Sequence, residues 1–227
     1  MARGHLRADG TDPTPAEKAH ARKVGDRLAR RYPEIGTALA YDSPWQLLVS
    51  TVLSAQTTDE TVNKVIPVLF AKYPTPDDLA SADPEDVESI VFSTGFYRQK
   101  TRSVLALAAD LVDKHDGEVP VDIDELTKLR GVGRKTASVV LAEAFGVPAI
   151  AVDTHVKRLS NRLGLTTESD PTKIEADLKA LFPRSRWRQL SMRLIQYGRD
   201  ICDARKPACF QCGLIDLCPF PDKRMSG

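Results

Sequence analysis

Apolar residues recur at intervals of three and four along most of the chain, which is the spacing of helices with one buried face. Between residues 97 and 115 that face carries Val104, Leu107, Ala108 and Leu111. Only the run 147–152 has the length and composition of a strand, and no second run is present to pair with it. The pattern predicts an all-α protein.

Polar residues that cap helices stand before most of these apolar segments. Ser43 with Pro44 is an N-cap followed by a proline suited to the first helical turn. Thr57 and Glu60 are spaced as a capping box, in which each side chain bonds the other residue's backbone N–H. We expect helices over residues 43–53, 57–73, 83–94, 97–115, 122–129, 134–145, 168–182 and 187–199, with one more after Asp153.

The composition is that of an ordinary globular protein of 227 residues, with 42% hydrophobic and 28% charged residues. The first 20 residues hold charged groups and no apolar stretch, which argues against a signal peptide. No segment is long and apolar enough to span a membrane. We therefore expect an intracellular protein that does not enter membranes, with residues 1–19 as a flexible tail.

The net charge of +1 hides a regional imbalance. Residues 37–94 carry 2 basic and 9 acidic side chains, whereas residues 148–227 carry 14 basic and 9 acidic ones. Basic residues gather in two segments, 128–135 and 184–206. Two basic patches on a neutral protein indicate one face that binds a polyanion, although solvated helix faces give the same counts.

The chain has four cysteines, all within 17 residues: Cys202, Cys209, Cys212 and Cys218. In an intracellular protein, thiols this close together favour a shared metal centre over two disulfides. Structural zinc sites usually pair two short Cys-x(2–4)-Cys units, and only one such unit is present. The spacing therefore favours a four-thiolate iron–sulfur cluster and leaves zinc as the alternative.

Residues 129–137, LRGVGRKTA, join two expected helices through a turn with two glycines. Gly131 and Gly133 allow a tight turn and close approach of the backbone to a ligand, and Val132 is expected to point inward. The backbone N–H groups at the start of the following helix would bind one phosphate without reading base sequence. A purely structural turn is the alternative for this pattern taken alone.

Four motifs stand together in this chain: LSAQTTD at 53–59, LRGVGRKTA at 129–137, VDTH at 152–155 and the cysteine-rich tail. In order and separation they closely resemble the bacterial endonuclease III family over roughly residues 20–222. These base excision DNA repair enzymes remove oxidised pyrimidines and nick the resulting abasic strand. Arg130 departs from the family, which often has Pro there, and should add a charge near the phosphate while leaving the hairpin intact.

The resemblance implies that Lys135 attacks C1′ of a flipped-out nucleotide to form a Schiff base, and that Asp153 is the catalytic carboxylate. Without it, Lys135 would be a phosphate contact and Asp153 a helix N-cap. Gln56 matches the loop that fills the gap left by the flipped base, with a solvated loop residue as the alternative. Phe96 or Tyr97 is expected to wedge between base pairs, or else to pack in the core.

Further DNA contacts are expected in the hairpin, the VDTH motif and the loop between the first two cysteines. The residues are Gly131, Val132, Gly133, Arg134, His155, Arg205 and Lys206. His155 has a second interpretation, as a packed helix residue. By the same resemblance, Cys202, Cys209, Cys212 and Cys218 would hold a 4Fe–4S cluster.

We accordingly expect an all-α, two-domain helix-hairpin-helix DNA glycosylase fold with a C-terminal iron–sulfur cluster loop. Residues 37–147 would form a helical bundle containing the hairpin at 122–145, and residues 20–36 with 148–227 would form the cluster domain. The predicted activity is that of a bifunctional DNA N-glycosylase and abasic-site lyase. It would act as a cytoplasmic, nucleoid-associated monomer on double-stranded DNA that contains oxidised pyrimidines or abasic sites.

Two other functions fit part of the sequence. An adenine-removing mismatch glycosylase has the same hairpin and cysteine pattern, but it lacks the lysine and carries an extra C-terminal domain. A non-catalytic DNA-binding module would use the hairpin and a structural metal. Trapping of a Schiff base would separate the second alternative from an enzyme.

Overall fold

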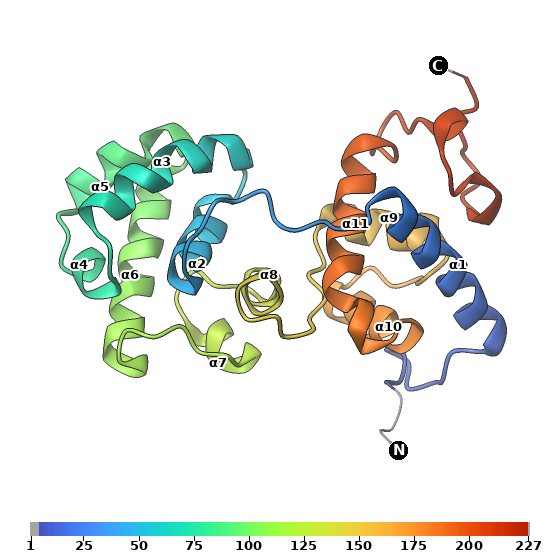
Figure 1. Ribbon diagram of the computed structural model, residues 1–227, viewed down its shortest axis with the longest axis horizontal. Helices are drawn as coiled ribbons and strands as arrows, with labels where there is room; N and C mark the ends of the chain where they lie inside the picture. The colour runs from blue at the N-terminus through green and yellow to red at the C-terminus, as the bar shows by residue number, and fades with distance from the viewer. Residues whose placement is uncertain (1–4, 227) are drawn as a thin grey trace. The chain divides into compact units, whose positions relative to one another are not determined.

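The structure is a computed structural model that describes residues 5–226. Throughout this range the chain is helical and contains no strand, as the apolar pattern predicts, and it divides into two compact units (Figure 1). Unit 1 comprises residues up to 36 and from 148 onward, and unit 2 comprises residues 37–147. No helix in the described range has the length and the apolar run needed to cross a membrane.

Unit 2 is a bundle built around one apolar helix. Its elements are α2 (Pro44–Leu53), α3 (Asp59–Lys72), α4 (Pro76–Ala80), α5 (Pro84–Val91), the 3-10 turn η1 (Phe92–Thr94), α6 (Tyr97–His115), α7 (Ile123–Lys128) and α8 (Arg134–Ala144). α2 is central because eight of its ten residues are buried. α3, α6 and α8 pack against α2, while α4 and α5 pack on α6.

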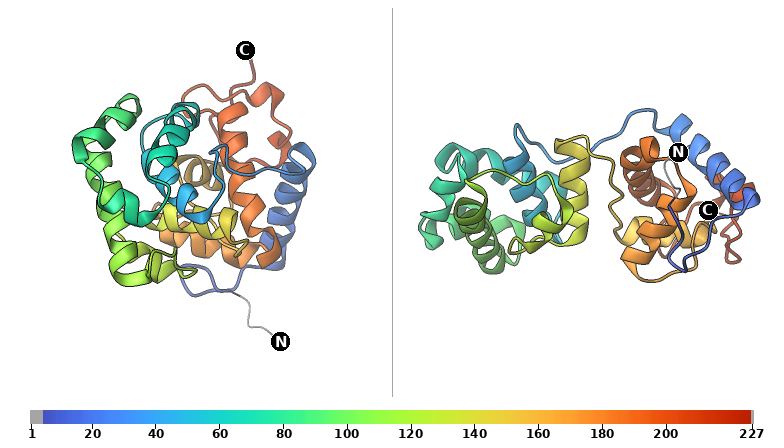
Figure 2. Two further views of the ribbon diagram at one scale, coloured as in Figure 1. Left: turned by 60° about the vertical axis from the view of Figure 1, so that its left-hand side comes forward. Right: turned by 90° about the horizontal axis from the view of Figure 1, so that it is seen from below.

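Unit 1 brings together the two ends of the chain. Its elements are α1 (Pro15–Arg31), α9 (Thr154–Arg162), α10 (Pro171–Leu181), the 3-10 turn η2 (Arg184–Arg186), α11 (Trp187–Asp200) and the 3-10 turns η3 (Cys209–Gln211) and η4 (Ile215–Leu217). α11 packs against α9 and α1, and α1 also packs against α10 and η4. The first helix and the C-terminal segment therefore share one unit, as both views in Figure 2 show.

A polar cap followed by proline begins five of the helices, α1, α2, α4, α5 and α10. The caps are Thr14, Ser43, Thr75, Asp83 and Asp170, and each accepts a hydrogen bond from a backbone N–H of the first turn. Proline suits the next position because its fixed φ is helical and its missing N–H would have had no partner inside the helix. The start of α4 at Thr75 carries this same signal, although no helix was expected there.

The predicted capping box of α3 is wrong by one residue. Thr58 is the N-cap, and its hydroxyl accepts from the Thr61 N–H at 3.2 Å. Glu60 instead accepts a hydrogen bond from Lys64 on the next turn, at 2.7 Å. Neighbouring threonines offer the same cap chemistry, so their order along the chain does not decide which one is used.

The expected tail of residues 1–19 is too long. α1 already begins at Pro15, with a capping box between Thr14 and Glu17. Before it, the Ala8 N–H donates to the buried Asp177 carboxylate of α10 at 3.0 Å, and Arg7 lies 3.7 Å from the same carboxylate. Residues 7–14 are therefore attached to unit 1, and residues 1–4 of the expected tail lie outside the described range.

Candidate functional site

The hairpin between α7 and α8 is fixed to unit 2 by buried leucine and valine side chains. Leu126, Leu129 and Val132 follow one another at three-residue intervals and are 0%, 3% and 6% exposed. Val132 points inward, as expected, so only its backbone is available to a ligand. Arg130, Gly131 and Gly133 are the exposed residues of the turn, so a ligand meets glycine backbone and the Arg130 side chain.

The two glycines of the turn serve different purposes. Gly131 has φ +80°, and a Cβ there would lie 3.1 Å from the Cβ of Ser103 on α6, so the fold itself requires glycine. Gly133 has φ −89°, and a Cβ there would meet no protein atom within 4 Å. The fold does not require glycine at 133, and its missing side chain leaves open space beside the start of α8.

α8 begins without a side-chain cap. Gly133 is the N-cap, and the first bond inside the helix joins the Ala137 N–H to the Gly133 carbonyl at 3.0 Å. The N–H groups of the first turn therefore lack the side-chain acceptor that α1, α3 and α9 each have. An uncapped helix start with open space beside it has the chemistry of an anion site.

Lys135 is the second residue of α8 and is exposed. Its amine forms no hydrogen bond or ion pair within residues 5–226. The neighbouring Arg134 is also exposed. An amine held at the open end of a helix lies close to whatever anion binds there.

Arg130 does not add a free charge to the turn, contrary to expectation. Its guanidinium is paired with the Asp110 carboxylate of α6, with Nε and Oδ2 3.1 Å apart. Arg130 thus reaches back to unit 2, and the hairpin is intact, as expected. No local pattern links Arg130 to Asp110, because the two residues are 20 positions apart.

Asp153 caps α9 with its side chain. Its Oδ1 accepts the Val156 N–H at 2.8 Å, and the residue is half-buried. This geometry matches the N-cap alternative and leaves the second carboxylate oxygen, Oδ2, outside the cap bond. One carboxylate can therefore cap the helix and face a substrate at once.

His155 packs against α11. A Cβ at Gly198 would lie 2.7 Å from His155 Nδ1, so glycine at 198 makes room for the imidazole. Nδ1 also lies 3.0 Å from Arg158 Nη2. Burial lowers the pKa of His155, and Arg158 acts in the same direction against the opposing charge of Asp153. These contacts fit the packed-residue interpretation, and contact with DNA stays a prediction.

Three exposed non-glycine residues of unit 2 stand on left-handed backbone: Gln56, Phe96 and Asp116, of which Asp116 ends α6 as its C-cap. Gln56 follows α2 with φ +56°, and Phe96 precedes α6 with φ +49° and is 65% exposed. Tyr97 is half-buried, with its ring 4.8 Å from that of Phe92. Non-glycine residues adopt this conformation at a cost of about 1 kcal/mol, which often marks a functional position. Of the two aromatic candidates, Phe96 is the more exposed.

The loop after Cys202 presents two exposed cations. Arg205 and Lys206 both donate their backbone N–H to Oδ1 of Asp203, at 2.8 Å each. Arg162 of α9 donates to the Asp203 and Ala204 carbonyls at 2.7 and 2.8 Å. Neither Arg205 nor Lys206 forms an ion pair in the described part of the chain. Their charges are available to a phosphate backbone.

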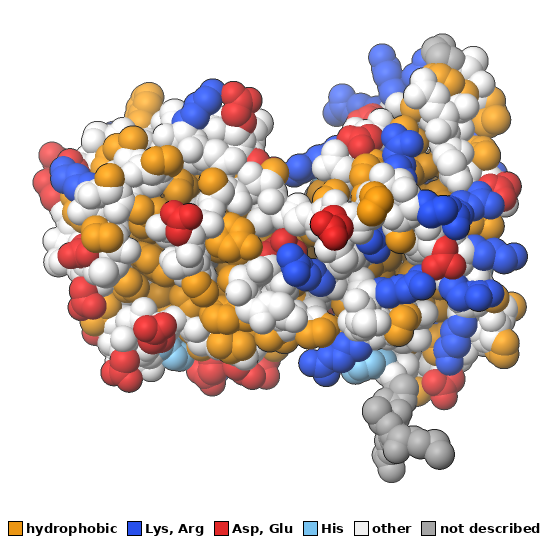
Figure 3. Space-filling model, viewed as in Figure 1, with side chains coloured by type: hydrophobic (Ala, Val, Ile, Leu, Met, Phe, Trp, Pro, Cys, Tyr) orange, Lys and Arg blue, Asp and Glu red, His pale blue; other side chains and the backbone are white. Residues whose placement is uncertain are grey.

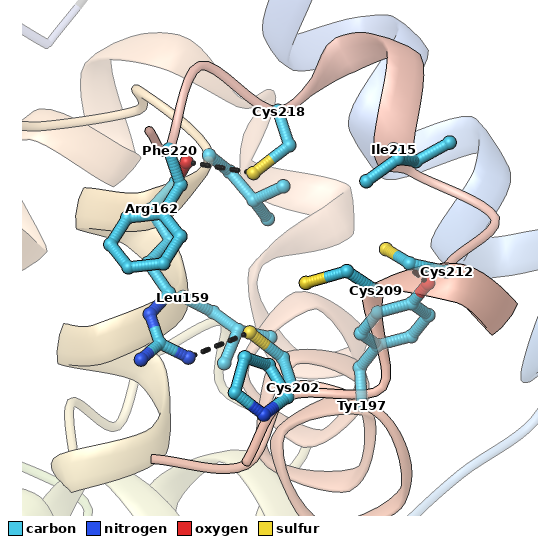
Figure 4. A pocket seen from close by; sticks show the side chains of 11 residues that line it. Leu159, Arg162, Tyr197, Cys202, Cys209, Cys212, Ile215, Cys218 and Phe220 are labelled. Atoms are coloured by element: carbon cyan, nitrogen blue, oxygen red, sulfur yellow. Dashed lines mark hydrogen bonds between the residues drawn. The ribbon is translucent and has the colours of Figure 1, made fainter. Parts of the chain in front are cut away.

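The four cysteines line one pocket of unit 1 together with apolar side chains. The lining includes Leu159, Leu163, Pro207, Ile215 and Phe220. Figure 4 shows Cys202, Cys209 and Cys218 facing a shared space, with Cys212 beside the Tyr197 hydroxyl. All four are free thiols, which agrees with a metal centre and not with two disulfides.

Protein donors also reach the sulfur atoms. Arg162 Nη1 lies 3.3 Å from Cys202 Sγ, and the Tyr197 hydroxyl lies 3.2 Å from Cys212 Sγ. Among the described residues, no three His, Cys, Asp or Glu side chains are grouped so that they could hold one metal ion. The four thiols therefore line one largely apolar pocket but are not grouped as ligands of a single metal ion.

Sequence reasoning missed the residues that support these sites. Asp110 holds Arg130, Arg162 holds the cationic loop, and Lys100 donates to the Thr94 carbonyl at 2.7 Å beneath the turn that carries Phe96. Lys100 is 5% exposed, and burial lowers its pKa. A signal was present only for Asp110, since an acid stands beside Leu107 and Leu111 on a buried helix face.

The positive charge of the chain belongs to unit 1. The sequence of unit 2 has 10 basic and 17 acidic side chains, whereas that of unit 1 has 22 basic and 14 acidic ones. In Figure 3, Lys and Arg side chains are frequent on the unit that contains α1, α10 and α11 and sparse on the other. The basic segment 184–206 accounts for much of this difference.

The chain is similar to known DNA repair proteins over most of its length. Residues 49–184 match the family described as "HhH-GPD superfamily base excision DNA repair protein". Endonuclease III of Synechocystis sp. is 49% identical over 205 residues, covering 90% of this chain and 94% of that protein. Endonuclease III of Escherichia coli is 38% identical over 206 residues, covering 91% and 98%.

Solved structures give the same result. A trapped covalent intermediate of an endonuclease III with DNA is 46% identical, covers 89% of this chain and 95% of that chain, and has a TM-score of 0.85. A thermostable thymine-DNA glycosylase, 23% identical with a TM-score of 0.81, shares the fold. The resemblance seen in the sequence motifs is therefore confirmed, and this chain belongs to the endonuclease III family of the HhH-GPD superfamily.

Proposed function

We propose that this chain removes oxidised pyrimidines from duplex DNA and then cleaves the abasic strand through a Schiff base on Lys135. Membership of the endonuclease III family makes it a base excision repair glycosylase and abasic-site lyase. One observation carries the assignment to Lys135. The exposed amine stands at the second position of the helix whose uncapped N-terminus suits a phosphate, so phosphate binding brings the amine to the neighbouring sugar.

The reaction begins with a nucleotide turned out of the duplex, because a stacked base hides C1′. The neutral amine of Lys135 forms a bond to C1′ while the bond from C1′ to the base breaks and the base leaves with its electron pair. Opening of the sugar ring gives the Schiff base. Loss of a proton from C2′ then expels the 3′ phosphate by β-elimination.

Asp153 would act on the same sugar with a different role. A carboxylate stabilises the positive charge that develops on the sugar as the base departs, and it can assist proton transfer. The cap bond to Val156 uses Oδ1 and holds the side chain in one rotamer. A preorganised carboxylate stabilises a transition state without paying a reorganisation cost at the moment of reaction.

Gln56 and Phe96 are suited to the duplex on either side of the flipped nucleotide. Both are exposed and stand on left-handed backbone. The Gln56 amide can both donate to and accept from an unpaired base, and the Phe96 ring can enter between base pairs. Phe96 is chosen over Tyr97, because the Tyr97 ring is half-buried and lies against the ring of Phe92.

A 4Fe–4S cluster is the metal centre that we propose for the cysteine pocket. Cys202, Cys209, Cys212 and Cys218 would hold it, with Tyr197 among the residues around the sulfur atoms. When bound, the cluster would cross-link α11 to the C-terminal segment, which otherwise has only short 3-10 turns. It would thereby fix the loop that presents Arg205 and Lys206 to the phosphate backbone.

Borohydride trapping tests the proposed function. The wild-type protein is expected to become covalently attached to DNA that contains an abasic site or an oxidised pyrimidine, because borohydride reduces the Schiff base. Lys135→Ala should abolish trapping. Lys128→Ala is the matched control, since Lys128 is an exposed lysine of the same hairpin that is paired with Glu125 at 2.7 Å. Undiminished trapping of Lys135→Ala would place the nucleophile elsewhere.

A further inference from the structure

A buried carboxylate of α6 holds the first residue of the hairpin turn. Asp110 accepts the Arg130 backbone N–H at 2.9 Å, and it accepts from the guanidinium Nε at 3.1 Å and Nη2 at 3.2 Å. The Asp110 side chain is 3% exposed, and Lys114 donates to it from the next turn of α6 at 2.7 Å. Four hydrogen bonds therefore converge on one carboxylate that has no role in the proposed reaction.

These contacts keep Asp110 ionised. Burial alone would raise its pKa, but hydrogen bonds from Arg130 and Lys114 hold the pKa well below its usual range. A buried charge costs free energy of desolvation, which good geometry and several hydrogen bonds must offset. The Asp110 carboxylate therefore restricts Arg130 and Lys114 to one arrangement.

α6 contacts the turn at a second point. Ser103, two turns before Asp110 on the same helix, stands where a side chain on Gly131 would have to lie. The backbone of residues 130 and 131 is therefore fixed from one side by a hydrogen bond and by close packing. The positions of these two residues set the direction of the backbone N–H groups that follow at the start of α8.

We propose that Asp110 is a positioning residue for DNA binding, which sets the direction of the hairpin N–H groups through its bond to the Arg130 backbone. The inference rests on the proposed function, since it requires a DNA phosphate at the hairpin. It also assigns the Arg130 guanidinium to Asp110 and not to DNA. Nothing in this assignment involves the sugar, so Asp110 affects binding and not the chemical step.

A positioning role and a purely electrostatic role for Asp110 predict opposite changes in DNA affinity. If Asp110 positions the hairpin, Asp110→Ala weakens binding to undamaged duplex by about tenfold, the equivalent of one net hydrogen bond. If Asp110 only neutralises Arg130, the same substitution removes a negative charge and frees a cation. Binding would then tighten, and the salt dependence would steepen by about one unit of log–log slope.

Asp113→Ala is the matched control. Asp113 is an exposed carboxylate three residues further along α6 that also acts on the Arg130 charge, so its removal changes the charge equally without removing a hydrogen bond to the turn. We expect no weakening from it. Arg130→Ala should weaken binding by less than Asp110→Ala, because the backbone N–H and the carboxylate both remain. Single-turnover excision at saturating DNA should keep its rate in Asp110→Ala, while the half-saturating DNA concentration rises about tenfold.

Asp110→Asn decides the question if the alanine variant does not fold. It keeps the volume and one acceptor for the Arg130 N–H, so the proposal expects binding no tighter than that of the wild type. Tighter binding than that of Asp113→Asn would overturn the proposal. Gly133→Ala probes the hairpin independently. If Gly133→Ala weakens DNA binding and Asp110→Ala does not, the positioning role of Asp110 is wrong and the phosphate site stands. If neither variant weakens DNA binding, the phosphate site at the hairpin is wrong as well.

Discussion

Substitution of the two hairpin glycines by alanine should have different effects. Gly131→Ala should lower the stability of the fold, whereas Gly133→Ala should weaken the binding of a phosphate. Alanine at 131 must adopt φ +80°, which costs roughly 1–2 kcal/mol, and its Cβ would lie 3.1 Å from the Ser103 Cβ. For a chain of this size, 1 kcal/mol lowers Tm by about 2–4 °C. We therefore expect Gly131→Ala to lower Tm by roughly 2–8 °C.

Gly133→Ala should leave Tm nearly unchanged. At φ −89° alanine is unstrained and stabilises by about 0.4–1 kcal/mol through the unfolded state, and this is offset by its poorer N-cap propensity. A phosphate against the start of α8 would meet the new methyl group. Loss of one hydrogen bond to a charged group is worth about 1.5–3 kcal/mol, so binding should weaken roughly 10- to 150-fold.

The assay compares calorimetric Tm with fluorescence anisotropy of undamaged duplex at one fixed salt concentration. Gly131→Ala is expected to lose stability, and Gly133→Ala is expected to lose affinity with Tm intact. Wild-type affinity in Gly133→Ala would refute the phosphate site at this turn. A fall in Tm of more than a few degrees in Gly133→Ala would show that the space beside it is needed by the fold.

Three further predictions concern the other groups of the site. Asp153→Asn should slow base excision by about 10²- to 10⁴-fold in single-turnover assays and keep duplex affinity, because the amide still caps α9. Lys206→Glu should reduce the log–log salt slope of binding by about one or more without changing the preferred lesion, and an unchanged slope would show that Lys206 does not meet DNA. Purified protein should be yellow-brown with iron and sulfide in equal amounts, while stoichiometric zinc without sulfide would exclude the cluster.

The helices were predictable because their signals are local. The face of Val104, Leu107, Ala108 and Leu111 is set by spacing alone, and the helix that carries it, Tyr97–His115, ends where expected. Cap chemistry was less decisive at α3, since Thr57 and Thr58 differ only in position and the structure uses the second. α4 was missed because five residues are too few to show a period.

The candidate residues were predictable as members of motifs, but their surroundings were not. Nothing within a few positions of Arg130 marks Asp110 as its partner, because that contact depends on how α6 lies against the hairpin. Likewise, left-handed backbone at Gln56 and Phe96 has no signature in residue types that usually avoid it. Long-range contacts and local strain both come from the packed unit.

The discontinuity of unit 1 has a consequence for synthesis on the ribosome. α1 leaves the exit tunnel first, but its packing partners α10 and α11 are translated only after all of unit 2. At about 5–20 residues per second, the apolar side of α1 waits on the order of ten seconds for them. Unit 2 is contiguous and can fold during that interval. Codon changes that slow translation between residues 37 and 170 would therefore prolong the period in which α1 can be captured by chaperones or aggregate.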